Sequence, residues 1–216
     1  MSKANRQTES KDPYRLRTAR IDAGRSHSSA LSLYILSLIV VLAIPALSQV
    51  SRNFPNKKSE ITSPDGRYLV QDVDHNQEYR VLFLKDKTTG KTRQVYEYTR
   101  GASVIWSPDS RHFVVDDSAG SDYTETRILS VDETVPKIDV QKEILDKRKD
   151  VPGGHHEYFY VAYWIDSRRV LVYHWGYGGE DPNGFCECYV YRLNGRVYKC
   201  ARQPKDSDSA CERAIP

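Results

Sequence analysis

His155, His156 and Glu157 form the most concentrated polar group of the 216-residue sequence, and His174 follows downstream. Imidazole and carboxylate groups bind transition metals, and a bound metal activates water for hydrolysis. The His-Glu-x-x-His pattern of zinc proteases is absent, however, because three aromatic residues follow Glu157. Adjacent strand residues also point to opposite faces of a sheet, so one ion would rarely bind both neighbouring histidines. We therefore expect a loop entering a strand here, with no metal and no cofactor, and keep a metal-dependent hydrolase as an alternative.

Three acidic residues, Asp116, Asp117 and Asp122, are expected at the tip of a hairpin. Carboxylates in a loop can bind calcium, but this spacing does not match an EF-hand loop, so we interpret them as solvated turn residues. The glycine-rich stretch 176–184 lacks the lysine and the following helix of a phosphate-binding loop. The Gly-x-Ser-x-Gly element of serine hydrolases is also absent. We therefore expect no catalytic residues, and the sequence favours a protein that is not an enzyme.

Aromatic residues gather between positions 158 and 177. Such side chains line sugar- or peptide-binding faces, and they also form packing pairs between neighbouring strands. They are Tyr158, Tyr160, Tyr163, Trp164, Tyr173, Trp175 and Tyr177. The sequence leaves both roles open.

The elements that would position these residues begin after an apolar stretch. No aspartate, glutamate, lysine or arginine occurs between Ser26 and Ser51, and residues 30–50 are mostly apolar. At about 1.5 Å per residue, a helix of this length would span roughly 30 Å, the hydrocarbon thickness of a bilayer. Residues 1–29 carry seven basic and three acidic side chains, and a basic flank stays in the cytoplasm. The sequence therefore predicts a disordered cytoplasmic leader (1–29), a transmembrane signal anchor (30–50) and an exported C-terminal part.

A cleavable signal peptide is the alternative interpretation of the apolar stretch. Pro45 would break the helix, and Ala46-Leu47-Ser48 resembles a cleavage site. Cleavage near Ser48 would release a secreted, inhibitor-like module. In either case residues 51–216 are exported, and their 25 basic and 26 acidic groups nearly cancel. The basic charge of the chain therefore indicates membrane topology, and we expect no nucleic-acid partner.

The exported part (58–216), after a predicted linker at 51–57, has the pattern of an all-β domain. Short segments rich in tyrosine, valine and isoleucine alternate with turns of glycine, proline, asparagine and aspartate. One stretch, 136–150, has the apolar spacing of a helix. We therefore predict antiparallel sheets with one inserted helix.

A short motif recurs in three copies along the exported part. Ser-Pro-Asp-Gly suits a type I turn, because proline presets the backbone angle at the second position and the serine hydroxyl can bond a nearby amide. We expect each copy to be a structural hairpin turn without a direct functional role. The motif residues are Ser63, Pro64, Asp65 and Gly66 in the first copy, Trp106, Ser107, Pro108 and Asp109 in the second, and Trp164 and Asp166 in the third.

The motif resembles the repeat of TolB-like and WD40-like β-propellers, whose blades carry Trp-Ser-Pro-Asp-Gly followed by a basic and a hydrophobic residue. The resemblance covers roughly residues 58–200 and implies blade-like antiparallel sheets. The first two copies are 44 residues apart, so residues 51–216 hold fewer than four such units, whereas propellers normally have four to eight blades. The resemblance therefore implies a partial or very small propeller, an open stack of blades, or a fragment completed by association.

Four cysteines follow the apolar stretch, namely Cys186, Cys188, Cys200 and Cys211. An even number in an exported domain predicts disulfides, with three full pairings open. Asn194-Gly195 predicts a hairpin turn, and a three-residue loop there would put Cys188 and Cys200 on one face. Bridges to Cys211 would hold the C-terminal tail. A zinc site is less favoured, because Cys-x-Cys lacks the Cys-x-x-Cys spacing.

These patterns together predict a single-pass membrane protein with an exported, propeller-like β domain. Rigid sheets that display loops at one rim suit recognition, although fold alone transfers no activity. We expect binding or scaffolding in the cell envelope. Besides the membrane, the expected partner is a protein or a glycan.

Overall fold

The computed structural model describes residues 49–178 and 184–201. The chain divides into two units, Met1–Pro45 and Ala46–Pro216, and all described residues belong to the second. The predicted membrane helix therefore lies outside the described residues, except for Gln49 and Val50, which are not helical. In the described part of the chain, no helix has the length and apolar character needed to cross a membrane.

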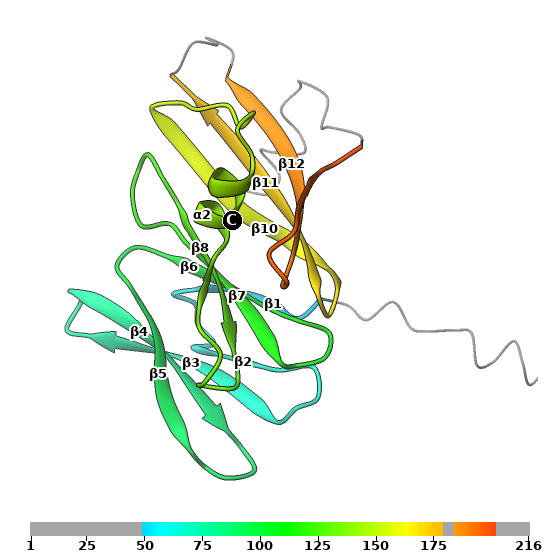
Figure 1. Ribbon diagram of the computed structural model, residues 1–216. Coiled ribbons are helices and arrows are strands. Elements are labelled where there is room, and N and C mark those ends of the chain that lie inside the picture. The colour runs from blue at the N-terminus through cyan, green and yellow to red at the C-terminus, as the bar shows by residue number, and fades with distance from the viewer. Residues whose placement is uncertain (1–48, 179–183, 202–216) are drawn as a thin grey trace, which may run out of the picture. The chain divides into compact units, whose positions relative to one another are not determined.

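Three antiparallel sheets and one short helix make up the described residues, which confirms the predicted all-β class (Figure 1). The first sheet has the order β2 (Glu60–Thr62), β3 (Tyr68–His75), β4 (Tyr79–Asp86) and β5 (Thr92–Tyr98). The middle sheet has the order β1 (Ser51–Phe54), β6 (Ala102–Trp106), β7 (His112–Asp117), β8 (Glu125–Ser130) and β9 (Ile138–Asp139). The third sheet has the order β10 (His156–Asp166), β11 (Arg169–Tyr177), β12 (Phe185–Arg192) and β13 (Val197–Lys199). Helix α2 (Val140–Lys147) follows β9.

The middle sheet is buried on both of its faces. Val104 and Phe113 share an apolar cluster with side chains of the first sheet, such as Leu82. Their sequence neighbours Ile105 and Val114 share a second cluster with α2 and the third sheet. Because successive side chains of a strand point to opposite faces, a strand buried on both faces must be apolar at nearly every position. The apolar runs of β6 and β7 therefore place the middle sheet between the other two.

The recurring motif forms the turn between β2 and β3 in the first sheet and the turn between β6 and β7 in the middle sheet. The hydroxyl of Ser63 donates to the carboxylate of Asp65 (2.6 Å) and accepts from the Tyr68 N–H (2.9 Å). Ser107 makes the equivalent pair of bonds, with Asp109 at 2.7 Å. Both serines are buried. The turns therefore satisfy their own polar groups where two strands of a blade meet the core.

Two segments differ from the sequence predictions. The predicted linker at 51–57 begins with strand β1, which pairs antiparallel with β6. The local sequence Ser-Arg-Asn-Phe has little strand preference, so the pairing is supplied by a strand far along the chain. The predicted helix at 136–150 is the shorter α2, because Ile138 and Asp139 form β9. The side chain of Asp139 then caps α2 by accepting from the Lys142 N–H (2.9 Å).

One predicted disulfide is confirmed, between Cys188 of β12 and Cys200 just after β13. Tyr191 pairs with Val197, and this register places Cys188 directly opposite Cys200, with their Cα atoms 5.4 Å apart. Cys186 is also disulfide-bonded, and Cys211 lies outside the described residues. The third sheet is therefore covalently closed at its last hairpin.

Candidate functional site

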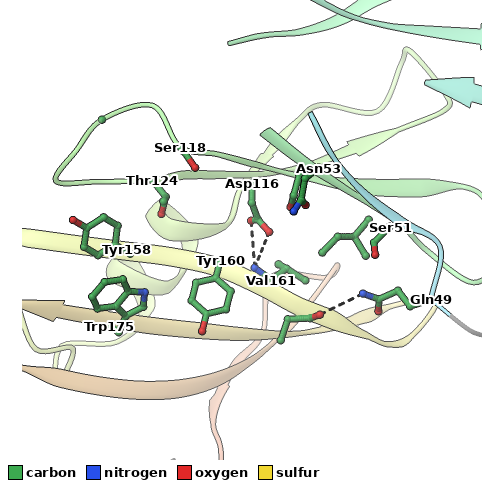
Figure 2. Close-up of a pocket in the computed structure, with 14 residues that line it drawn as sticks. Gln49, Ser51, Asn53, Asp116, Ser118, Thr124, Tyr158, Tyr160, Val161 and Trp175 are labelled. Carbon is green, nitrogen blue, oxygen red and sulfur yellow. Dashed lines mark hydrogen bonds between the residues drawn. The ribbon is translucent and has the colours of Figure 1, made fainter. Parts of the chain in front are cut away.

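A pocket of about 610 Å³ opens between the middle sheet and strand β10 (Figure 2). One side comes from β1, β6 and β7, and the other from β10 and β11. The lining residues are Gln49, Ser51, Asn53, Ser103, Ile105, Asp116, Ser118, Gly120, Thr124, Tyr158, Tyr160, Val161, Ala162 and Trp175. Hydroxyl, amide and aromatic groups dominate this lining, and Asp116 adds a carboxyl group.

A row of polar side chains crosses the middle sheet at the floor of the pocket. Asn53 pairs with Ser103, Ser103 with Asp116, and Asp116 with Thr126. Residues in register on neighbouring strands share a face, so this polar row faces the third sheet. The next row on the same face begins with Ser51 and continues with the apolar residues Ile105, Val114 and Ile128. The floor is therefore polar at one end, where the pocket opens, and apolar where the sheets pack.

Tyr158, Tyr160 and Trp175 form an aromatic wall opposite the polar row. The rings of Tyr158 and Trp175 stack with centroids 4.2 Å apart, and Tyr160 packs against Tyr173 at 5.6 Å. The Tyr158 hydroxyl donates to the Ser121 carbonyl (2.7 Å), which holds its ring in place. These residues are cross-strand packing pairs and also pocket-lining residues, so both roles that the sequence left open apply to them.

Asp116 is the carboxyl group of the polar row, and it bonds one residue of the third sheet and one of the middle sheet. It accepts from the Val161 N–H (3.2 and 3.1 Å to its two oxygens) and from the Thr126 hydroxyl (2.7 Å). Burial raises the pKa of Asp116 to about 7, although these two hydrogen bonds act in the opposite direction. Asp116 therefore changes charge near neutral pH.

On the edge of β10 that faces the pocket, side chains make the hydrogen bonds to the main-chain groups that a neighbouring strand would otherwise make. Gln49 accepts from the Trp164 N–H (2.9 Å) and donates to the Ala162 carbonyl (3.3 Å). Thr124 bonds both the N–H and the carbonyl of Phe159, at 2.8 and 2.6 Å. Because Asp116 also accepts from the Val161 N–H, few main-chain groups on this edge lack a hydrogen-bond partner. Gln49 thus lines the pocket and also holds β10.

The structure does not bring the candidate metal ligands together. His156 stacks on Tyr177, whereas the ring of His174 stacks on Phe159, on the opposite face of the third sheet. Glu157 accepts from the Gly154 N–H (2.9 Å). Among the described residues, no group of three histidine, cysteine or acidic side chains has metal-binding geometry.

His174 is a core residue in the third sheet. It is fully buried, and neither ring nitrogen has a hydrogen-bond partner among the described residues. Burial lowers its pKa to about 3, so the ring is neutral at physiological pH.

The acidic group around residue 116 also differs from its sequence prediction. Asp116 and Asp117 belong to strand β7, so neither is a solvated turn residue. Asp117 lies on the face opposite Asp116, where it accepts from the Tyr96 hydroxyl (3.1 Å). Burial raises the pKa of Asp117 to about 6. The two neighbouring acids therefore serve two different interfaces of the middle sheet.

The remaining sequence candidates are not among the residues that line the pocket. Trp106 and Trp164 are buried, and the Trp164 indole N–H donates to the Ile105 carbonyl (3.1 Å). Asp166 accepts from the Arg168 N–H (2.9 Å) in the third turn. Three pocket residues were missed because of the segments predicted for them, since Gln49 lay in the predicted membrane helix and Ser51 and Asn53 lay in the predicted linker. A polar glutamine at the end of an apolar run was the one available signal.

Comparison with known proteins finds similarity in structure but none in sequence to a family model or a curated protein. No protein-family model and no curated protein matches the sequence. Among solved structures, the chain is similar to the β-propeller domain of the Trilobed protease from Pyrococcus furiosus, described as having an open velcro topology. The match has a TM-score of 0.45 and 14% sequence identity, and it covers 66% of this chain and 42% of that chain. The chain thus spans less than half the length of that structure.

Proposed function

We propose that this protein is a membrane-anchored, exported binding domain whose ligand occupies the pocket between the middle sheet and β10. The observation that supports this most directly is the pairing of the polar row with the aromatic wall across one cavity. Concave sites with aromatic walls and a few convergent polar groups are the usual form of ligand pockets. Apolar contact on one side and hydrogen bonding on the other suit a polar ligand of moderate size.

The pocket chemistry favours binding over catalysis. In the part of the chain that the structure describes, no histidine lines the pocket beside the hydroxyls of Ser51, Ser103 and Ser118. An activated serine needs an adjacent base within hydrogen-bond reach. Asp116 is the acidic residue among those that line the pocket, and it accepts hydrogen bonds from Val161 and Thr126. These hydroxyls therefore serve as hydrogen-bonding groups for a ligand.

The anchoring part of the proposal comes from the sequence. Residues 30–48 would cross the membrane, with the basic leader in the cytoplasm and the β domain outside. The domain would be a partial propeller of the TolB-like or WD40-like type, with binding or scaffolding in the cell envelope as its role. Membrane pellets washed with alkaline carbonate should retain the full-length protein, and added protease should cleave the domain only from the exported side. Release of the domain after cleavage near Ser48 would contradict the anchor and leave the binding proposal standing.

Fluorine NMR of the fluorotryptophan-labelled protein tests the binding part. The chain has three tryptophans, of which Trp106 and Trp164 are buried in the core and Trp175 lines the pocket. Soluble oligosaccharides and short peptides serve as probes. A probe that occupies the pocket should shift the Trp175 signal and leave the Trp106 signal unchanged as the internal control. If every probe leaves Trp175 unchanged, or moves all three signals together, the pocket is not the binding site.

A further inference from the structure

Strand β1 presents an open edge to the pocket. The Trp106 N–H donates to the Val50 carbonyl (2.9 Å), which marks one hydrogen-bonded pair between the chain before β1 and β6. Antiparallel strands alternate hydrogen-bonded and non-hydrogen-bonded pairs, so Arg52 also bonds β6, whereas the main-chain groups of Ser51 and Asn53 point away from it. No described residue makes a hydrogen bond to those groups. Both residues are exposed and line the pocket.

The two strand edges at the pocket therefore differ. The β10 edge is occupied by the side chains of Gln49, Asp116 and Thr124, whereas the β1 edge keeps the N–H and carbonyl groups of Ser51 and Asn53 free. A free strand edge is a template for another extended chain, whose main chain supplies matching donors and acceptors. A sugar would use side-chain groups of the pocket but would not match this main-chain pattern. The edge thus points to a peptide.

The surroundings of β1 indicate which peptide would fit. In a strand added beside β1, alternate side chains point to opposite faces. One set would enter the pocket, against the aromatic wall of Tyr158, Tyr160 and Trp175. The other set would enter a second groove of about 710 Å³ on the other side of β1, which is lined by Arg52, Lys57 and Lys58, with Glu60 as its acidic residue. The first set meets aromatic rings and the second meets an excess of positive charge.

We infer that the ligand of the pocket is an extended peptide segment that adds to β1 as a further strand of the middle sheet. Its side chains alternate between aromatic or aliphatic residues, which contact the aromatic wall, and acidic residues, which contact Arg52, Lys57 and Lys58. Main-chain hydrogen bonds to Ser51 and Asn53 supply affinity, and the alternation supplies specificity. This inference rests on the proposed function, because it names the ligand class of the same pocket.

An array of seven-residue peptides, probed with the full-length protein in detergent, tests the alternation. One set alternates valine or tyrosine with glutamate, and the matched set has the same composition with the two kinds of residue in separate blocks. The alternating set should be retained preferentially, and its retention should weaken as salt rises, since exposed charge pairs are screened. Equal retention of the two sets would overturn the inference.

Backbone methylation of the best peptide then tests strand addition itself, with the unaltered protein. Two versions of the peptide carry methyl groups on alternate main-chain nitrogens, one at the odd positions and the other at the even positions. Only one of these two sets of N–H groups would face β1. We expect methylation of that set to weaken binding about tenfold or more, as one to two lost hydrogen bonds imply, and methylation of the other set to have little effect. Equal effects of methylating either set would show that no strand forms.

Two variants at one position give the matched test on the protein. Asn53→Pro removes the free N–H, and proline is tolerated on an edge strand where that N–H faces outward. Asn53→Ala removes the same side chain and keeps the N–H, so binding should be about tenfold weaker in the proline variant than in the alanine variant. Equal affinity of two folded variants would contradict the inference. If oligosaccharides shift the Trp175 signal and no peptide does, the inference of a peptide ligand is overturned and the proposed function stands. If neither kind of probe shifts the Trp175 signal, both the inference and the proposed function are refuted.

Discussion

Asp116 provides a test of the interface between the middle and third sheets. Its carboxyl group has an ordinary pKa of 3.8, and burial raises the pKa to about 7 in the folded protein. Between these two pH values the folded state binds more protons than the unfolded state, so the free energy of unfolding must decrease as pH rises. At about 1.36 kcal/mol per pKa unit, the loss between pH 5 and pH 8 is about 2.5 kcal/mol.

Asp116→Asn should remove this loss. The asparagine keeps an oxygen that accepts from Val161 and Thr126, and it has no proton to release in this range. Urea unfolding of both proteins at several pH values gives the difference between their free energies of unfolding, in which contributions from all other titrating groups cancel. The variant should gain about 2.5 kcal/mol on the wild type between pH 5 and pH 8.

Asp132→Asn is the matched control. Hydrogen bonds from the Thr134 N–H and hydroxyl lower the pKa of Asp132, so it stays ionised throughout this range in both states. The difference between this variant and the wild type should therefore be constant from pH 5 to pH 8. If the Asp116→Asn difference is equally constant, the carboxyl group of Asp116 is not desolvated by the third sheet, and the packing described for the pocket floor is wrong.

Three further predictions concern the core. Arg80→Met should lower the free energy of unfolding in urea by about 3–5 kcal/mol. The reason is that the buried Asp72 carboxylate loses the Arg80 guanidinium, which lies 2.6 Å from it. A loss below about 1 kcal/mol, which is typical of an exposed ion pair, would contradict this. Replacing Cys188 and Cys200 by serine should cost about 3 kcal/mol in urea unfolding, since their bridge closes a loop with a sequence separation of 12; an unchanged free energy of unfolding would contradict this. Because burial lowers the pKa of His174 to about 3, the unfolded state takes up the proton first, and stability is lost as pH falls from about 6.5 toward 3. His174→Leu should therefore unfold at a lower pH than the wild type in an acid titration followed by circular dichroism, and an unchanged midpoint would show that His174 is not the group responsible.

The strands, turns and helix were predicted from patterns of residues close together in the sequence. The alternating and continuous apolar segments, such as those of β7 and β11, predicted strands because a sheet face buries every second side chain and a sheet buried on both faces buries nearly all of them. The Ser-Pro-Asp motif predicted turns, since the hydrogen bonds of the Ser63 and Ser107 hydroxyls join residues two to five positions apart. The helix was predicted too long, because nothing local showed that Ile138 and Asp139 would pair with β8.

The pocket could not be predicted in the same way. Its floor and wall come from segments that no local interaction connects, with Asn53 on β1, Asp116 on β7 and Tyr158 on β10. The aromatic residues were visible as candidates in the sequence, but the metal-binding candidates were more prominent there. His156 and His174 proved to lie on opposite faces of one sheet, because the pairing register of β10 and β11 decides which faces they share.

The amino-acid sequence by itself thus determined the all-β class, the hairpin turns and the cysteines available for bridging, because these depend on residue type and on neighbours a few positions away. Tertiary structure decided which strands became neighbours, that Gln49 and β1 belong to the β domain, and that β10 is held by side chains while the β1 edge stays open. The physical reason is that main-chain hydrogen-bonding groups are the same in every residue. Which of them remain free to bind a partner depends on strand pairing across the whole chain.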